Sequence, residues 1–152
     1  MTNKEQLFNQ INPMGVMLEL EQYPDKIRDQ KSKVRDLTQT FADVDADRAS
    51  RELEIFAEIN DETDPATGKA KFSNEKARQA ELTKRCRADQ DYLISARLSK
   101  EAQQAVDQAQ DELERLENKY RSCRYRADII AAELRFWAGK EEEGSVHSHQ
   151  PY

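Results

Sequence analysis

The chain has 152 residues, of which 36% are charged and 37% are hydrophobic, and its formal net charge is −6. Average globular chains are about a quarter charged and nearly half apolar, so this composition argues against a compact fold with a large core. Four glycines and four prolines provide few turns, which argues against a sandwich, a barrel or a doubly wound sheet. The sequence predicts an all-α fold of elongated helices, each of which buries only one stripe.

The composition also limits where in the cell the protein is expected and which classes of partner it is expected to bind. An acidic chain is not a general nucleic-acid binder by charge alone. No run approaches about 18 consecutive apolar residues, and residues 1–10 lack an apolar signal core, so we expect a cytoplasmic protein that does not cross a membrane. Cys86 and Cys123 lie roughly 55 Å apart if one straight helix carries both, which predicts reduced thiols within the chain.

The N-terminal segment, residues 1–23, contains a turn signal at Asn12-Pro13-Met14-Gly15. A short helix is expected on each side of this turn. The segment carries Leu7, Phe8, Ile11, Val16, Met17, Leu18 and Leu20. A terminal segment this apolar must pack on another part of the chain to be ordered, so we expect it to pack on the longer helices.

The first long helix is predicted over residues 24–60, because proline suits the first turn of a helix and Pro24 begins this segment. Its apolar residues follow a heptad pattern that Arg48 and Arg51 interrupt. The interruption either fixes the register of the pairing or reflects a sideways shift of the stripe toward Leu53, Phe56 and Ile59. The a positions are Ile27, Val34, Phe41 and Ile55, and the d positions are Leu37 and Val44.

Residues 61–73 are predicted to form a loop, in which Gly68 takes a positive φ and either Ser73 or Asn74 caps the next helix. A second long helix is predicted over residues 74–138, with a possible bend near Asp89. Gly139 is expected to end it, leaving a polar tail over residues 139–152. Its a positions are Val106, Leu113, Tyr120, Ala127 and Leu134, and its d positions are Ala102, Ala109, Leu116, Cys123, Ile130 and Trp137.

The charges predict how the two long helices pair. Residues 43–64 hold nine acidic and two basic residues, whereas residues 69–100 hold nine basic and four acidic residues. An antiparallel hairpin places these segments face to face, with residue i opposite roughly residue 133 − i, and charges beside a seam select such a pairing. We therefore expect a long, coiled-coil-like helical hairpin that makes residues 1–139 one elongated domain.

The second helix is longer than the first, and the overhang near residues 107–137 carries the most regular heptads. An uncovered apolar stripe favours association, so we expect the N-terminal segment and a second copy of the chain to cover it in a homodimer. This predicts a non-enzymatic interaction protein that presents a helical face. Aromatic-rich anchors are typical of such faces, and the candidates are Tyr120, Tyr125, Ile130, Leu134, Phe136 and Trp137.

An alternative function is single-stranded nucleic-acid binding, as in an accessory protein of recombination or replication. Residues 119–126 interleave basic and aromatic side chains, which can bind the phosphate backbone and stack on bases. Residues 69–100 add a second basic segment. The candidate residues are Arg78, Lys84, Arg85, Arg87, Lys119, Arg121, Arg124 and Arg126.

Catalytic, metal and cofactor motifs receive little support. Asp43, Asp45, Asp47 and Glu54 have the spacing of a calcium loop, but Arg48 stands where that loop needs glycine. His147 and His149 supply only two metal ligands. The basic neighbours of Cys86 could lower its pKa, yet no histidine base accompanies it. We therefore predict no catalytic residue, no metal and no cofactor.

Residues 59–93 contain Thr67-Gly68-Lys69, Phe72, Ser73-Asn74-Glu75, Arg78 and Asp91-Tyr92. This pattern resembles small coiled-coil helical proteins of phages and prophages, mostly of unassigned function, in which one helix precedes such a loop and another follows it. The motif covers about a quarter of the chain, and the layout most of it. The resemblance implies a phage or mobile-element accessory protein, and it carries no catalytic residue over.

Overall fold

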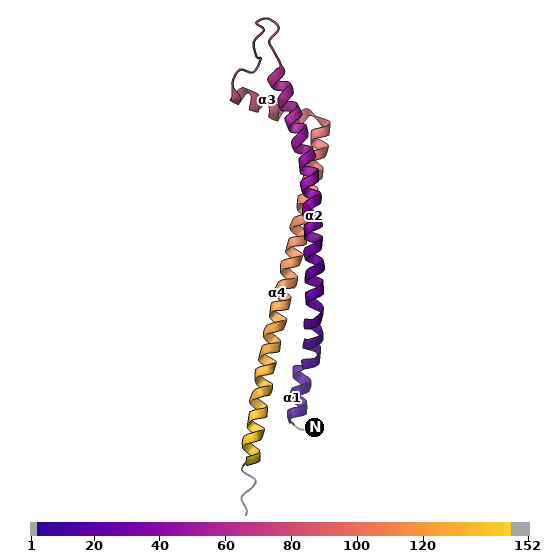
Figure 1. The fold of residues 1–152 in the computed structure, drawn as a ribbon, viewed down its shortest axis with the longest axis vertical. Helices are drawn as coiled ribbons and strands as arrows, with labels where there is room; N and C mark the ends of the chain where they lie inside the picture. Colours follow the sequence, from indigo (N-terminus) through magenta and orange to yellow (C-terminus); the bar gives the residue numbers. More distant parts are fainter. Residues whose placement is uncertain (1–2, 147–152) are drawn as a thin grey trace, which may run out of the picture. The chain divides into compact units, whose positions relative to one another are not determined.

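A computed structural model describes residues 3–146, with side-chain surroundings for residues 5–6 and 9–140. The element order is α1 (Asn3–Ile11), α2 (Pro13–Asp61), α3 (Glu75–Ala88) and α4 (Gln90–Val146) (Figure 1). The predicted all-α fold is confirmed: α2 and α4 form an antiparallel helical hairpin on which the N-terminal segment packs. The contacts divide the chain into two compact units, and both α2 and α4 contribute to each of them. Unit 1 comprises Met1–Lys31 with Asp111–Tyr152, and unit 2 comprises Ser32–Gln110.

Helix α2 begins earlier than the sequence predicts, at Pro13 and not at Pro24. Asn12, at φ 45°, precedes it and accepts a hydrogen bond from the Gly15 N–H through Oδ1 at 3.2 Å. Pro24 therefore lies inside the helix, where it removes one backbone hydrogen bond. The helix continues because Val16 and Tyr23, before the proline, and Ile27, after it, all pack in the core of unit 1.

The predicted second long helix, residues 74–138, is in fact two helices that meet at Asp89 (Figure 1). The Asp89 N–H donates to the carbonyl of Arg85 at 2.9 Å and so ends α3. Its carboxylate Oδ1 accepts the Tyr92 N–H at 2.7 Å and caps α4. Arg51 of α2 donates to both carboxylate oxygens, from Nε at 3.1 Å and from Nη2 at 2.6 Å. One aspartate thus ends a helix, begins the next and joins both to α2.

The C-terminal end of α4 also differs from the prediction, because the helix continues through Gly139 to Val146. Glycine destabilises a helix interior by about 1 kcal/mol but does not forbid one. Contacts one turn apart support this end, since the Lys140 ammonium lies over the rings of Phe136, at 4.7 Å, and Trp137, at 5.6 Å. Residues 139–146 of the predicted tail therefore belong to α4. Residues 147–152 lie outside the described residues.

The core of unit 2 lies where α3 packs against the end of α2. Ile55, Ile59, Leu82 and Cys86 are buried there, with Phe56, Phe72 and Tyr92 packed around them. The sideways extension of the α2 stripe to Phe56 and Ile59 is therefore real, whereas Leu53 is exposed. The two arginines that interrupt the stripe are paired: Arg48 with Asp45 and Glu52, and Arg51 with Asp89 and Glu54.

The antiparallel register agrees with the prediction only in the loop. Thr63 bridges Ala70, and the Lys71 N–H donates to the Glu62 carbonyl at 3.0 Å. Farther along, residue i lies opposite residue 144 − i or 148 − i, a shift of 11 to 15 residues from the predicted register. Ser99 donates to Asp45 at 2.9 Å in unit 2, and Lys31 lies 3.2 Å from Glu117 in unit 1. Phe72, Ser73 and Asn74, which follow the bridged loop before α3 begins and have no counterpart on the α2 side, account for three residues of this shift.

Charge complementarity holds around the loop. Glu62, from the acidic segment, pairs with Arg85 and with Lys71, the latter at 3.0 Å. The α3 cap is Asn74, whose Oδ1 accepts the Ala77 N–H at 2.7 Å. The pairing of opposite charges predicted across the hairpin is thus present at this end of unit 2.

Gly68 takes the predicted left-handed conformation, at φ 65°. Replacing it with alanine is expected to lower the free energy of unfolding by roughly 1 kcal/mol, because an L side chain is strained there. Gly139→Ala is the matched control. Nothing lies within 4 Å of the added Cβ, and alanine favours a helix, so its effect should have the opposite sign. Urea denaturation of both variants tests this, and an equal effect at the two sites would contradict it.

Candidate interaction surface

The core of unit 1 is the seam between α2 and α4. Val16, Tyr23 and Cys123 are buried in it, and the Cys123 side chain is fully enclosed. The rings of Tyr23 and Tyr120 lie 6.1 Å apart at an interplanar angle of 49°. Six half-buried residues complete the seam: Leu20, Ile27, Leu116, Tyr120, Ala127 and Ile130. All of these except Leu20 are predicted heptad positions of the two long helices, so the heptads of unit 1 form the intramolecular seam.

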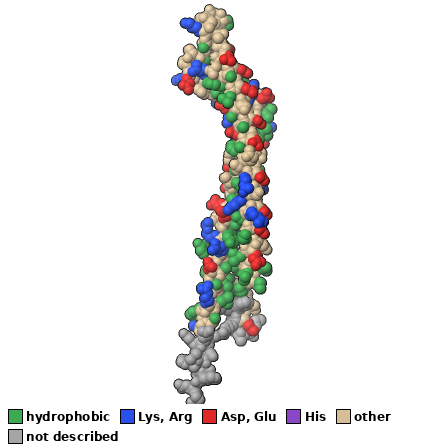
Figure 2. Space-filling view, viewed as in Figure 1, with side chains coloured by type: hydrophobic (Ala, Val, Ile, Leu, Met, Phe, Trp, Pro, Cys, Tyr) green, Lys and Arg blue, Asp and Glu red, His purple; other side chains and the backbone are tan. Residues whose placement is uncertain are grey.

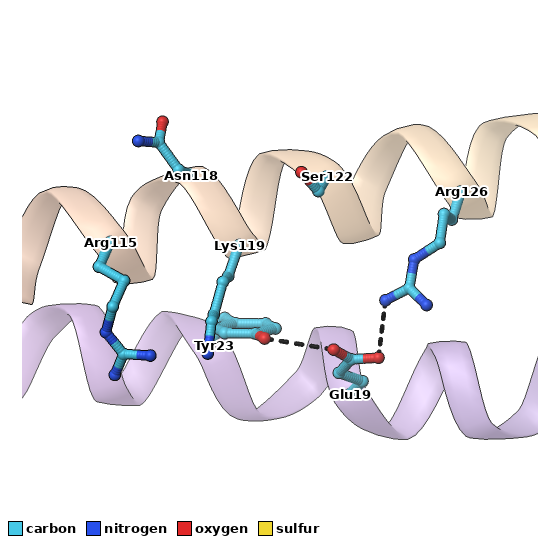
Figure 3. A pocket seen from close by; sticks show the side chains of 7 residues that line it. All are labelled: Glu19, Tyr23, Arg115, Asn118, Lys119, Ser122 and Arg126. Atoms are coloured by element: carbon cyan, nitrogen blue, oxygen red, sulfur yellow. Dashed lines mark hydrogen bonds and ion pairs between the residues drawn. The ribbon is translucent and has the colours of Figure 1, made fainter.

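One groove runs beside this seam with a volume of about 450 Å³, and its lining side chains come from both helices (Figure 3). Glu19 accepts from the Tyr23 hydroxyl at 3.2 Å and from Arg126 Nη2 at 2.8 Å. Burial first, and then the hydrogen bond to Glu19, raise the pKa of Tyr23. Arg126 and Glu19 thus form an ion pair between α4 and α2 at this groove. Its lining residues are Glu19, Tyr23, Arg115, Asn118, Lys119, Ser122 and Arg126.

A second groove of about 300 Å³ also has lining residues from both helices of unit 1. Lys31 forms its ion pair with Glu117 here, and the Arg124 guanidinium lies 5.9 Å from the centre of the Tyr120 ring. Both grooves offer cationic side chains around aromatic ones, in an open setting on the surface.

The most exposed of the large apolar side chains of α4 in unit 1 lie away from the seam. Tyr125, Ile129 and Phe136 are 63%, 59% and 60% exposed. With exposed Ala132 they are spaced by four, three and four residues, which places them on one face of the helix. At 100° per residue this face is opposite the one that carries Cys123, Ala127 and Ile130. We name Tyr125, Ile129, Ala132 and Phe136 the outward stripe. Figure 2 shows that hydrophobic side chains reach the surface over unit 1.

The six predicted partner-binding residues therefore divide into three groups. Tyr120 and Ile130 belong to the seam, and Tyr125 and Phe136 belong to the outward stripe. Leu134 and Trp137 occupy seam positions but are 41% and 40% exposed, and Trp137 contacts Phe136 edge-on with ring centres 5.9 Å apart.

Sequence reasoning missed Ile129, although its spacing from Tyr125 and Phe136 was a readable signal. It also did not single out the exposed face of α2 made by Met14, Met17 and Leu18. Both sets are apolar residues at helical spacing that lie off the main heptad.

The candidate nucleic-acid residues lie in different units. Arg78, Lys84, Arg85 and Arg87 belong to α3 in unit 2, whereas Lys119, Arg121, Arg124 and Arg126 belong to α4 in unit 1. Several already bind within the chain: Arg85 pairs with Glu62 and Glu81, Arg126 pairs with Glu19, and Arg121 donates to Asn118 at 3.2 Å.

The candidate reactive and metal-binding groups have ordinary surroundings. Cys86 is buried, and this burial raises the pKa of its thiol, contrary to the effect expected from its basic neighbours. The calcium-like segment from Asp43 to Glu54 is helical. Within residues 3–146, no three His, Cys, Asp or Glu side chains are grouped to hold a metal ion. His147 and His149 lie outside the described residues.

The chain is therefore a helical hairpin with an exposed apolar face on α4. Comparisons with family models, with curated proteins and with solved structures found no match. In the described part of the chain, no helix has both the length and the apolar character that crossing a membrane requires.

Proposed function

We propose that this chain is a non-enzymatic interaction protein that binds a partner helix on the outward stripe of α4. The homodimer expected through residues 107–137 is part of this proposal. The observation that carries it is the placement of Tyr125, Ile129 and Phe136, each more than half exposed, on one helix face. Apolar side chains that the fold leaves exposed on a common face are typical of protein-binding surfaces.

The energetics support a helical partner. Burying one large apolar side chain stabilises a complex by about 1.5–3 kcal/mol, and the outward stripe offers three of them. The helix is already formed and held by its seam, so binding does not have to order it, which reduces the entropy cost of association. An apolar stripe spaced by four, three and four residues fits the side chains of another helix.

The proposal places the protein in the cytoplasm, where free thiols such as Cys86 and Cys123 persist. The resemblance of residues 59–93 to small phage and prophage proteins supports an accessory role on a mobile element. Such a role requires binding rather than catalysis, in agreement with the surface described above.

The direct test is the solution mass of the protein with Ile129 changed to glutamate. The wild type should form a dimer, and Ile129→Glu should shift the mass toward that of a monomer, because it places a charge in the apolar contact. Leu53→Glu is the matched control, since Leu53 is 68% exposed on α2 in unit 2. Light scattering at several protein concentrations measures both, and circular dichroism checks that each variant is folded.

A single-stranded oligonucleotide added to the same samples distinguishes the alternative function, nucleic-acid binding, from the proposed one. Binding to phosphates weakens steeply as salt is added, whereas an apolar contact does not. A particle that gains mass with the oligonucleotide at low salt, and loses it at high salt, would contradict the proposal and favour the nucleic-acid role. An Ile129→Glu variant that dimerises as the wild type does would contradict the assigned surface.

A further inference from the structure

The charges beside the outward stripe alternate in sign along each of its flanks. In the heptad of this stripe, Ile129 and Phe136 take the a positions, and Tyr125 and Ala132 take the d positions. On one flank Arg126 is followed, seven residues later, by Glu133. On the other flank Asp128 is followed, seven residues later, by Arg135. Each flank therefore carries one charge of each sign, with the order of signs reversed between the two flanks.

We propose that the partner on the outward stripe is a second copy of this chain whose α4 runs antiparallel to the first. This inference rests on the proposed function, including its homodimer, and adds the direction in which the two α4 helices run. The apolar layers then pair Tyr125 with Phe136 and Ile129 with Ala132, each twice because the arrangement is symmetric.

An antiparallel pair brings like flanks together, so the charges meet their opposites. Arg126 faces Glu133 of the second copy on one flank, and Asp128 faces Arg135 of the second copy on the other. Symmetry repeats both contacts, which gives four attractive charge pairs around four apolar layers. Charges in these flanking positions set the orientation of paired helices.

A parallel pair brings unlike flanks together, and the charged side chains that then face each other have the same sign. Asp128 would face Glu133 of the second copy, and Arg121 would face Arg126. Like charges in these positions disfavour the pairing. The same sequence therefore supports the antiparallel direction and opposes the parallel one.

The flanking side chains are accessible for this contact. Asp128, Glu133 and Arg135 are exposed, and none of them has an ion-pair partner among the described residues. Arg126 binds Glu19 through Nη2 but its side chain remains 55% exposed. A guanidinium has five N–H donors, so Arg126 can keep Glu19 and still donate to Glu133 of the second copy.

The complementary region has defined ends. The next apolar layer would pair Ser122 with Gly139, which offers no apolar contact, and the next pair on the flank of Arg126 and Glu133 would set Lys119 against Lys140. The favourable contact therefore spans residues 125–136, roughly 18 Å of helix. A contact this short predicts a dimer that exchanges with the monomer, not a permanent one.

Reversal of one charge distinguishes the two directions by the sign of its effect. Asp128→Arg should raise the dimer dissociation constant roughly tenfold, because it sets two guanidinium groups against Arg135 residues. In a parallel dimer the same change would face Glu133 and tighten the complex. Adding Arg135→Asp to this variant should restore the wild-type constant. Asp47→Arg, at an exposed site of α2 in unit 2, makes the same charge change as a control.

A distance measurement gives an independent answer in the same dimer. A spin label on Asn118→Cys reacts at an exposed site, whereas Cys86 and Cys123 are buried, and unlabelled wild type controls for them. Antiparallel pairing separates the two labels by roughly 38 Å along the helices. Parallel pairing would bring them to about 10 Å, the distance between helix axes.

The outcomes separate this inference from the function on which it rests. A long label distance together with weakening by Asp128→Arg supports the antiparallel pair. A short distance, or tightening by Asp128→Arg, overturns the direction and leaves dimerisation through the outward stripe in place. A wild type that remains a monomer at every concentration tested overturns self-pairing itself.

Discussion

Replacing Ile59 with alanine should lower the free energy of unfolding by about 2–5 kcal/mol, the usual cost of removing a large aliphatic side chain from a packed core. Ile59 is only 1% exposed and contributes to the small core shared with Leu82 and Cys86. This core joins α3 to the end of α2, so the cost falls on unit 2. Urea denaturation followed by circular dichroism measures the change.

Leu53 provides the control for this prediction, since it lies on the same helix and is 68% exposed. Leu53→Ala deletes nearly the same atoms but creates no cavity, and its effect should stay within about 0.5 kcal/mol. Equal effects of Ile59→Ala and Leu53→Ala would show that the packing between α2 and α3 does not form in solution.

Asp89 should make the stability of unit 2 sensitive to acid. Hydrogen bonds from Arg51 first, and then from the Tyr92 backbone, lower the pKa of its carboxyl to about 2. Because the pKa is depressed in the folded state, the stabilisation is fully present above the ordinary pKa of aspartate, about 3.9, and is lost as the pH falls toward 2. Asp89→Asn should therefore be less stable than wild type at pH 7, with a difference that shrinks between about pH 4 and pH 2.

The asparagine variant separates the ion pair from the cap. An amide oxygen can still accept the Tyr92 N–H, so Asp89→Asn keeps the α4 cap and loses the charge interaction with Arg51. Asp89→Ala loses both and should be less stable than Asp89→Asn at every pH. Asp47→Asn serves as the exposed control. A stability difference between wild type and Asp89→Asn that does not change from pH 7 to pH 2 would contradict the assigned role of the carboxylate.

Both predictions concern features that sequence reasoning reached only in part. Ile59 was recognised as a sideways extension of the stripe, but its burial depends on α3, whose separation from α4 was left open. Asp89 was recognised as a possible bend. The residue that completes the break, Arg51, lies 38 residues away, a separation that no local pattern reveals.

The candidate surface was predicted to a similar extent. The heptad correctly marked Tyr120, Cys123 and Ile130 as facing a partner helix. The expectation that the N-terminal segment covers part of this face is confirmed, since Val16 and Tyr23 of α2 pack there. Once α2 occupies the heptad face, the remaining apolar residues of α4 lie on the opposite face. Tyr125 and Phe136 were singled out for their aromatic character, and only their exposure together with Ile129 makes them a stripe.

The sequence by itself determined the features that depend on neighbours along the chain. Helical periodicity defined the seam positions, the turn residues defined the loop with Gly68 at positive φ, and Asn74 was one of two expected caps. These follow from backbone sterics and from hydrogen bonds within a few residues.

Only the tertiary structure decided the features in which distant groups outweigh a local preference. Pro24 lies inside α2 because seam contacts hold the helix on both sides of it. Asp89 divides a sequence that has continuous helical character because Arg51 binds its carboxylate. In each case a contact between distant residues outweighs a local conformational preference of about 1–3 kcal/mol, which periodicity and propensity alone cannot reveal.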